Sequence, residues 1–332
     1  MKKAMALLVC FAMVLSCAVP VFATSGTGAS FGAYKHVFII GIDGAGRFFA
    51  ENDMPNFERI FENGAVKYDA RTEVPSDSGP NWASILTGVS YYKHWVHNGS
   101  SGEKERTSKT LFPSVFTYAR RAFPDCELAS FVNWENINFG IIENDIGVTE
   151  VDIQNDPALT DAICAYFDAG NAPTLFFVQL DDVDAAGHAH GSESPEYKNA
   201  MQAADGYIGK IYDAIERNGL MEDGLFIVTA DHGHTIRGGH GRFSMRESLT
   251  TVAAAGQTVV AGGQLDRITR NRDIAAIVLY ALGLKQPFGM SARLPGDLFE
   301  NTKGTRRSFI KDPLDGIISP VMWIVTLLYP EV

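Results

Sequence analysis

A chain of 332 residues with 46% hydrophobic and 20% charged residues can bury a full core, as one large domain or two small ones. This composition excludes a disordered or fibrous protein. The formal net charge of −11 repels polyanions, so we expect no nucleic-acid binding surface. An anionic substrate would need local positive charge, which metal ions could supply.

The first 23 residues have the features of a signal peptide. Lys2 and Lys3 precede an apolar stretch over residues 4–18, and residues 21–23 (VFA) form the small-x-small pattern that a signal peptidase cleaves. The apolar stretch is shorter than the ~20 residues of a membrane-spanning helix, which favours cleavage after Ala23 over a membrane anchor. We therefore expect an exported protein: secreted, periplasmic or on the cell surface. Removal of two lysines and no acid would change the net charge from −11 to −13.

Two cysteines would remain after cleavage, Cys126 and Cys164. In an exported chain they could form a disulfide, but the sequence leaves open whether their side chains meet. Two cysteines alone do not form a metal site.

Short apolar runs and longer helical segments then alternate along the chain. Residues 24–33 are small and polar and predict a linker, and the domain is expected to begin at about Tyr34. Strands buried on both faces of a sheet are predicted at 36–42, 174–180 and 225–230. Helices are predicted at 110–122, 158–169, 195–218 and 271–282. This order predicts an α/β fold, a three-layer α/β/α sandwich around a largely parallel sheet.

We assign residues 34–310 to one catalytic domain, in which loop insertions over about 89–160 would shape the substrate pocket. The C-terminal segment, residues 311–332, is apolar but shorter than a membrane span and interrupted by Pro320. It predicts a packed terminal segment and no transmembrane span after signal removal. Contact with a membrane surface or a partner is the alternative.

Each of the three predicted strands ends at an aspartate, and ligands bind beyond the carboxyl ends of the strands in an open parallel sheet. Histidines accompany two of these ends. The resulting oxygen and nitrogen donors are Asp43, Asp184, His188, Asp231, His232 and His240. Carboxylate and imidazole suit zinc first, then manganese or iron, and fit calcium poorly. Six donors are too many for one tetrahedral ion, so we expect two ions with three protein ligands each.

Ser78 is the candidate nucleophile. It precedes a predicted helix opened by Pro80 and Asn81, where backbone N–H groups and the helix dipole could face an anion. The alternative is that Ser76, Asp77 and Ser78 are only helix caps. Taken alone, this segment favours the caps.

In chain order, the motifs resemble the alkaline phosphatase superfamily and, within it, the type I phosphodiesterase/nucleotide pyrophosphatase branch. The matching segments are 41–44 (GIDG), 78–82 (SGPNW), 86–88 (LTG), 184–188 (DAAGH), 231–233 (DHG), 239–241 (GHG) and, in a late helix, 273–275 (DIA) with 282–284 (LGL). The resemblance extends over roughly residues 36–300, and ordered motifs over such a span are far more specific than any one of them.

The resemblance implies a role for each matching residue. Asp184, His188 and His240 would bind one zinc ion. Asp43, Asp231 and His232 would bind the other, and Ser78 Oγ would face this second ion. Ser78 would attack phosphorus and form a phosphoseryl intermediate, and its hydrolysis would give overall retention of configuration.

Either Asn81 or Asn98 would hold a non-bridging oxygen of the substrate. The family's spacing before the second asparagine is one residue longer than in residues 94–98 (HWVHN). His190 and His234 fall on no motif position. A solvated loop or contacts behind the ligands account for them better than direct metal binding.

Within this superfamily, a sulfatase is disfavoured because Trp82 stands where the sulfatase motif requires arginine. A cofactor-independent phosphoglycerate mutase would be longer and cytosolic. We favour a phosphodiesterase or pyrophosphatase that acts on a small phosphate ester or a nucleotide-like substrate. The alternatives are a phosphomonoesterase of the same superfamily, and a secreted protein that binds metal or phosphate without turnover.

Overall fold

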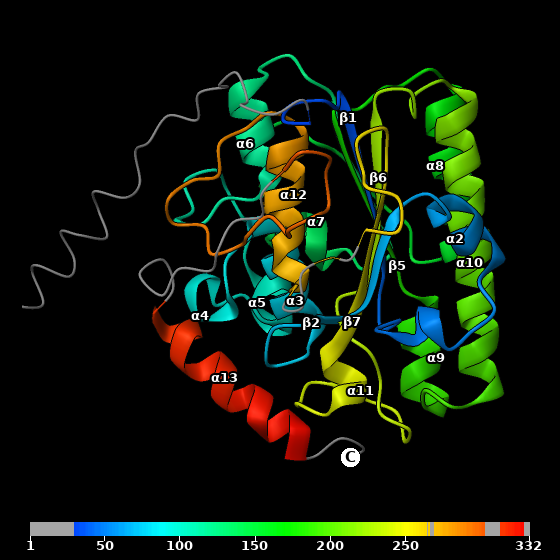
Figure 1. The fold of residues 1–332 in the computed structure, drawn as a ribbon, viewed down its shortest axis with the longest axis vertical. Coiled ribbons are helices and arrows are strands. Elements are labelled where there is room, and N and C mark those ends of the chain that lie inside the picture. The colour runs from blue at the N-terminus through cyan, green and yellow to red at the C-terminus, as the bar shows by residue number, and fades with distance from the viewer. Residues whose placement is uncertain (1–29, 264, 266–268, 303–312, 329–332) are drawn as a thin grey trace, which may run out of the picture.

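The computed structural model describes residues 30–263, 265, 269–302 and 313–328. Its centre is a seven-stranded sheet. The strands are β1 (His36–Ile42), β2 (Ala65–Arg71), β3 (Leu128–Val132), β4 (Thr149–Asp152), β5 (Leu175–Leu180), β6 (Gly224–Thr229) and β7 (Leu249–Ala255). Their order is β2-β7-β6-β1-β5-β3-β4 (Figure 1). The strands from β6 to β4 are parallel, and β7 runs antiparallel to β6 and to β2. The predicted largely parallel α/β fold is confirmed.

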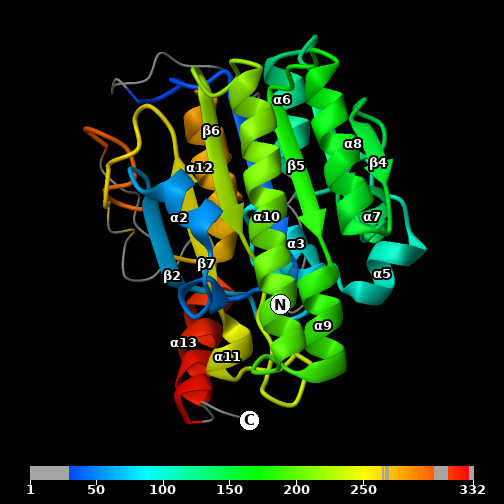
Figure 2. The same ribbon diagram turned by 90° about the vertical axis from the view of Figure 1, so that its right-hand side faces the viewer.

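Helices cover both faces of the sheet, as Figures 1 and 2 show. One layer contains α3 (Ser78–Thr87), α6 (Val115–Ala122) and α12 (Ile274–Ala281), and the other contains α2 (Pro55–Phe61), α8 (Asp156–Asp168) and α10 (Pro195–Arg217). Alternate residues of the central strand β1 point to opposite faces. Val37 and Ile39 therefore pack with the first layer, and Phe38, Ile40 and Ile42 with the second.

The shorter elements are η2 (Phe48–Ala50), α4 (Tyr91–His94), α5 (Asn98–Glu103), α7 (Asn136–Gly140), α9 (Asp182–His190), α11 (Met245–Ser248) and η3 (Asn271–Asp273). Residues 89–160 are only partly loop, because β3 and β4 within this region complete one edge of the sheet. Sequence reasoning missed them because β3 has five residues and β4 is a four-residue polar edge strand.

The predicted strands agree with β1, β5 and β6 to within one residue at each end. Among the helices, α6 begins five residues later than predicted, and the helix expected to open at Pro80 begins at Ser78. The predicted linker already contacts the domain at its described end, where buried Ser30 Oγ donates to the Glu300 carbonyl 2.6 Å away. The predicted signal peptide and its cleavage position lie outside the described residues.

The C-terminal helix α13 (Pro313–Leu328) contains Pro320 and presents an apolar stripe to solvent. Its exposed apolar side chains are Ile317, Val321, Ile324, Leu327 and Leu328, each 53–70% exposed. The prediction that this segment is packed is wrong for these five side chains. Among the described helices, none has both the length and the apolar character to span a bilayer. Cys126 and Cys164 are free thiols, so the disulfide that the sequence left open is not formed in this structure.

Candidate active site

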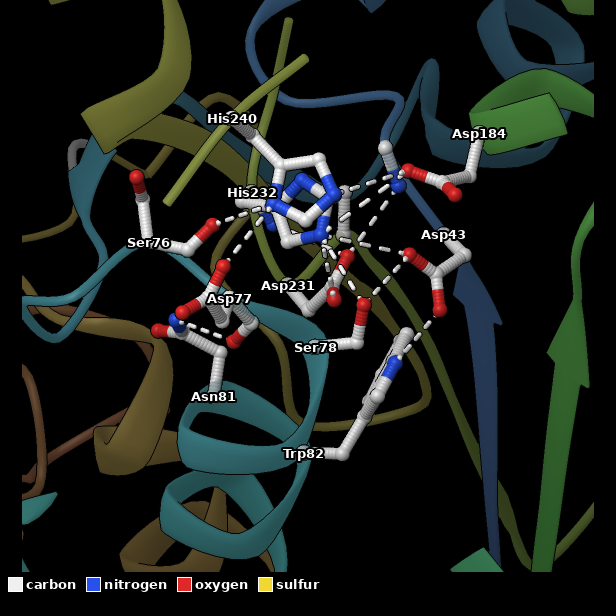
Figure 3. A network of polar contacts seen from close by, with 12 residues as sticks. Asp43, Ser76, Asp77, Ser78, Asn81, Trp82, Asp184, Asp231, His232 and His240 are labelled. Carbon is white, nitrogen blue, oxygen red and sulfur yellow. Dashed lines mark hydrogen bonds and ion pairs between the residues drawn. The ribbon is translucent and has the colours of Figure 1, made fainter. Parts of the chain in front are cut away.

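The candidate site lies at the carboxyl ends of three neighbouring parallel strands (Figure 3). Asp43 directly follows β1, α9 with Asp184 follows β5, and Asp231 follows β6. Because β1 lies between β5 and β6, these three ends are adjacent, although residues 43 and 231 are far apart in sequence. The structure brings together all six predicted ligands and Ser78.

Ser78 is the first residue of α3, and its side chain points toward two of the predicted ligands. Ser78 Oγ donates to Asp43 Oδ1 at 3.4 Å and lies 3.1 Å from His232 Nε2. The N-cap residue Asp77 makes no capping bond with its side chain. Helix capping therefore does not explain this segment, and Ser78 is positioned as a nucleophile would be.

Asp43, Asp231 and His232 form one compact ligand set beside this serine. His232 Nε2 lies 3.4 Å from Asp43 Oδ1 and 3.2 Å from Asp231 Oδ2. Donor atoms about 2.0–2.1 Å from a tetrahedral ion are about 3.3 Å from one another, so these spacings fit a shared ion. Asp231 Oδ2 is buried and has no hydrogen-bond partner among the residues that the structure describes. His232 Nδ1 faces the Gly233 carbonyl at 3.2 Å, which places the proton on Nδ1 and leaves the Nε2 lone pair for an ion.

Asp184, His188 and His240 form the second set. His188 Nε2 lies 3.3 Å from Asp184 Oδ2 and 3.0 Å from His240 Nε2, and His240 Nε2 is 3.6 Å from Asp184 Oδ1. His240 Nδ1 is 3.0 Å from the Ser76 carbonyl, so its Nε2 also presents a lone pair to the centre. The two sets adjoin, because the His232 and His240 rings stack with centroids 3.7 Å apart.

His234 also reaches the second set, and distance alone groups it with Asp184, His232 and His240. Its Nε2 lies 2.7 Å from Asp184 Oδ1, a hydrogen-bond distance, and its side chain is fully buried. We therefore interpret His234 as a donor that orients Asp184, and His188 as the ligand. A Cβ at Gly187 would overlap the His234 ring, which explains the glycine in the 184–188 motif.

For His234, the structure agrees with the second of the two predicted explanations, a contact behind a ligand, because its ring hydrogen-bonds Asp184. The sequence did not indicate which ligand it would contact. The other unassigned histidine, His190, is exposed.

Electrostatics also favour a bound cation. Burial raises the pKa of Asp43 well above its usual range, and the charges on Asp184 and Asp181 raise it further. Burial and then the charge on Asp43 do the same to the pKa of Asp231. Burial acts in the same direction on Asp184, but the hydrogen bond from His234 and the neighbouring imidazoles lower its pKa overall. A divalent ion would offset the repulsion between these carboxylates, and donors of oxygen and nitrogen without thiolate suit zinc-like ions.

Two further side chains, which sequence reasoning did not assign, hold Asp43 from behind. Trp82 Nε1 and Gln179 Nε2 both donate to Asp43 Oδ2, at 2.8 and 2.9 Å. Asp43 Oδ1 therefore remains directed at Ser78 and His232.

The two candidate asparagines, Asn81 and Asn98, differ in their contacts. Gly79 N donates to Asn98 Oδ1 at 2.7 Å, which places Asn98 beside the nucleophile.

Buried Asn81, in contrast, has both polar atoms engaged. Its Oδ1 accepts from Glu73 N, and its Nδ2 donates to the carbonyls of Pro75 and Asp77. Asn81 thus braces the loop before Ser78, and this geometry favours Asn98 for binding a substrate oxygen.

Comparison with known proteins is consistent with this geometry. A family model described as type I phosphodiesterase / nucleotide pyrophosphatase matches residues 37–112 and 117–276. The mouse GPI ethanolamine phosphate transferase 1 is 25% identical over 274 residues, which are 70% of this chain and 29% of that protein. The human protein of the same name is 30% identical over 149 residues, 39% of this chain and 16% of its own length. The chain thus spans less than a third of the length of these relatives.

Solved structures share the fold. An inactive variant of murine ectonucleotide pyrophosphatase / phosphodiesterase 5 in complex with AMP superposes with a TM-score of 0.63 at 13% identity, over 76% of this chain and 96% of that one. The 2-O GAG sulfatase BT1596 gives a TM-score of 0.59 at 11% identity, over 76% and 72% of the two chains.

Proposed function

Because the chain belongs to the type I phosphodiesterase/nucleotide pyrophosphatase family of phosphoester-acting enzymes, we propose that it is an exported phosphodiesterase with Ser78 as nucleophile and two zinc ions as cofactors. The observation that carries this proposal is the position of Ser78 Oγ at the N-terminus of α3, within 3.4 Å of Asp43 Oδ1 and His232 Nε2. A nucleophile, two sets of metal-type donors and a helix N-terminus meet at one point.

Three features of the donor sets fit bound ions: the spacing of the donor atoms, the direction of the imidazole lone pairs, and the buried Asp231 Oδ2, which has no hydrogen-bond partner among the described residues. Asp43, Asp231 and His232 would hold the ion beside Ser78, and Asp184, His188 and His240 the other. When bound, the ions would lower the pKa of the serine hydroxyl and offset charge on the attacking and leaving oxygens.

The residues of the chain define the reaction sequence. Ser78 Oγ forms a bond to phosphorus while the bond to the leaving alcohol breaks, and the alcohol departs with that electron pair and takes up the proton lost by Ser78. Asn98, bonded to Gly79 N, would orient a non-bridging oxygen. Water then cleaves the phosphoseryl bond and restores Ser78, so two in-line displacements retain configuration at phosphorus.

Family membership favours a diester over a monoester, because the matching family model is described as type I phosphodiesterase / nucleotide pyrophosphatase. In the part of the chain that the structure describes, the side chains bonded to Ser78 Oγ are Asp43 and His232. A monoester carries a second negative charge, for which an additional cationic group would be needed. A singly charged diester makes no such demand. A phosphomonoesterase is therefore the less favoured alternative.

Transfer to an alcohol is a second candidate reaction. Relatives named GPI ethanolamine phosphate transferases favour it, and the same phosphoseryl intermediate could be cleaved by an alcohol in place of water. Both reactions share the first step, in which Ser78 displaces the leaving group of a small phosphoester, and they differ only in what cleaves the intermediate.

The test compares bis-p-nitrophenyl phosphate with p-nitrophenyl phosphate as substrates. We expect zinc-dependent nitrophenol release, faster from the diester, that chelator and Ser78→Ala abolish. Release that survives Ser78→Ala would refute the nucleophile, and zinc binding without any release would support the non-catalytic alternative. An added acceptor alcohol such as glycerol distinguishes transfer from hydrolysis, because a transferase would form a phosphodiester of that alcohol at the expense of the hydrolysis product.

A further inference from the structure

A buried carboxylate outside the ligand sets caps the helix that carries two of the ligands. Asp156, the first residue of α8, is 1% exposed. Its Oδ1 and Oδ2 accept from Asp181 N at 3.0 and 2.9 Å, and Oδ2 accepts from Asp182 N at 2.8 Å. These N–H groups lie at the N-cap and first turn of α9, where helical N–H groups have no partner within the helix. Asp181, the N-cap residue itself, makes no capping bond with its side chain.

The same carboxylate is also held by the residue that follows β3, the strand beside β5. Asn133, directly after β3, donates from Nδ2 to Asp156 Oδ1 at 2.7 Å. Asn133 N in turn donates to Gln179 Oε1, and Gln179 Nε2 donates to both Asp43 and Asp181. A continuous chain of buried and partly buried hydrogen bonds therefore joins the N-terminus of α9 to Asp43 of the other ligand set.

From these contacts we infer that Asp156 is a positioning residue, which fixes the start of α9 and thereby the places of Asp184 and His188. Asp184 is the third residue of α9, and His188 is one turn later on the same face. A shift of the first turn moves both donor groups relative to His240, which comes from a different segment. The inference rests on the proposed function for its consequence, metal binding, and on the hydrogen bonds alone for its structural part.

The chain offers a matched control in Asp205. This carboxylate of α10 is 2% exposed and caps a different helix, α2, by accepting from Asn56 N at 3.0 Å and Phe57 N at 2.8 Å. Asp156→Asn and Asp205→Asn each turn one buried acceptor into a donor that faces N–H groups. Both variants should lose stability, but only the first loosens a helix that carries predicted ligands.

The experiment measures zinc affinity by chelator competition and amide hydrogen exchange of the metal-free proteins. In Asp156→Asn we expect a zinc affinity about 10-fold or more below that of the wild type at one of two sites, with faster exchange at residues 181–184. In Asp205→Asn we expect faster exchange at residues 56–57, with zinc affinity unchanged. If Asp156→Asn does not fold, Asn133→Ala removes one donor from the same carboxylate and should act in the same direction.

Equal zinc affinities in the two Asp→Asn variants, or unchanged exchange in α9, would overturn the role of Asp156. If the wild type and Asp156→Asn bind zinc with the same affinity, this inference is refuted and the proposed function stays intact. A wild-type protein that binds no zinc would refute both.

Discussion

Replacement of His234 by alanine tests whether zinc binding depends on the hydrogen bond that His234 donates to Asp184. His234 Nε2 donates to Asp184 Oδ1 at 2.7 Å, and its side chain is fully buried. A buried hydrogen bond to a charged group contributes about 1.5–3 kcal/mol, which corresponds to a factor of about 10–100 in affinity. We expect His234→Ala to weaken zinc binding by that factor, because Asp184 loses the donor that orients it.

The control for this variant is His94→Ala, which also deletes an imidazole, here a half-buried one. His94 Nε2 lies 2.8 Å from Ser84 Oγ. Burial lowers the pKa of His94 to about 3, so its ring is neutral at the pH of zinc-binding measurements. Zinc affinity is measured by chelator competition, and the absorption spectrum of the cobalt-substituted protein reports the ligand geometry. Zinc affinity that falls no further in His234→Ala than in His94→Ala would contradict the assignment.

Three further predictions follow from other groups. Burial and the charge on Asp43 raise the pKa of Asp231, so its ionised carboxylate is unfavourable in the folded, metal-free protein, and Asp231→Asn should raise the melting temperature of that form. The same variant should abolish the stabilisation that zinc gives to the wild type. Calorimetry with and without zinc checks both effects. Burial, Asp152 and Glu105 raise the pKa of Glu150 to about 7, above its unfolded value, so the free energy of unfolding should fall as the pH rises from about 4.5 through 7. Glu150→Gln should remove this fall and exceed the wild type in stability at pH 8 but not at pH 4, as urea unfolding at the two pH values would reveal. We also propose export with cleavage after Ala23; an exported protein whose N-terminal residue is not Thr24 would contradict that position.

The convergence of the six candidate ligands could be predicted because metal-ligand chemistry is carried by residue type and local position. A ligand must be a carboxylate or imidazole, and three of the carboxylates stand at the ends of apolar strands or one turn beyond, where a parallel sheet collects them. The resemblance to a known family then assigned Ser78, which the local sequence alone could not separate from a helix cap.

Residues that act through a distant partner could not be predicted in the same way. Trp82 lies 39 residues from Asp43 in sequence, and Gln179 lies 136 residues from it. Nothing in the flanking sequence of either residue indicates that its side chain meets this carboxylate. The choice between Asn81 and Asn98 likewise depends on which side chain the fold has already engaged. The strands β3 and β4 are too short for a periodic signal, and they form because β3 pairs with β5 and β4 then pairs with β3.

The sequence by itself determined the fold class, the family and the residue types of the site, because hydrophobic periodicity and ligand chemistry are local properties that survive without coordinates. Only the tertiary structure decided which groups hold those residues in place: His234 on Asp184, Trp82 and Gln179 on Asp43, and Asp156 on the helix of Asp184 and His188. These contacts join segments that packing alone brings together, and hydrogen bonds need positions accurate to a few tenths of an ångström, which no linear pattern encodes.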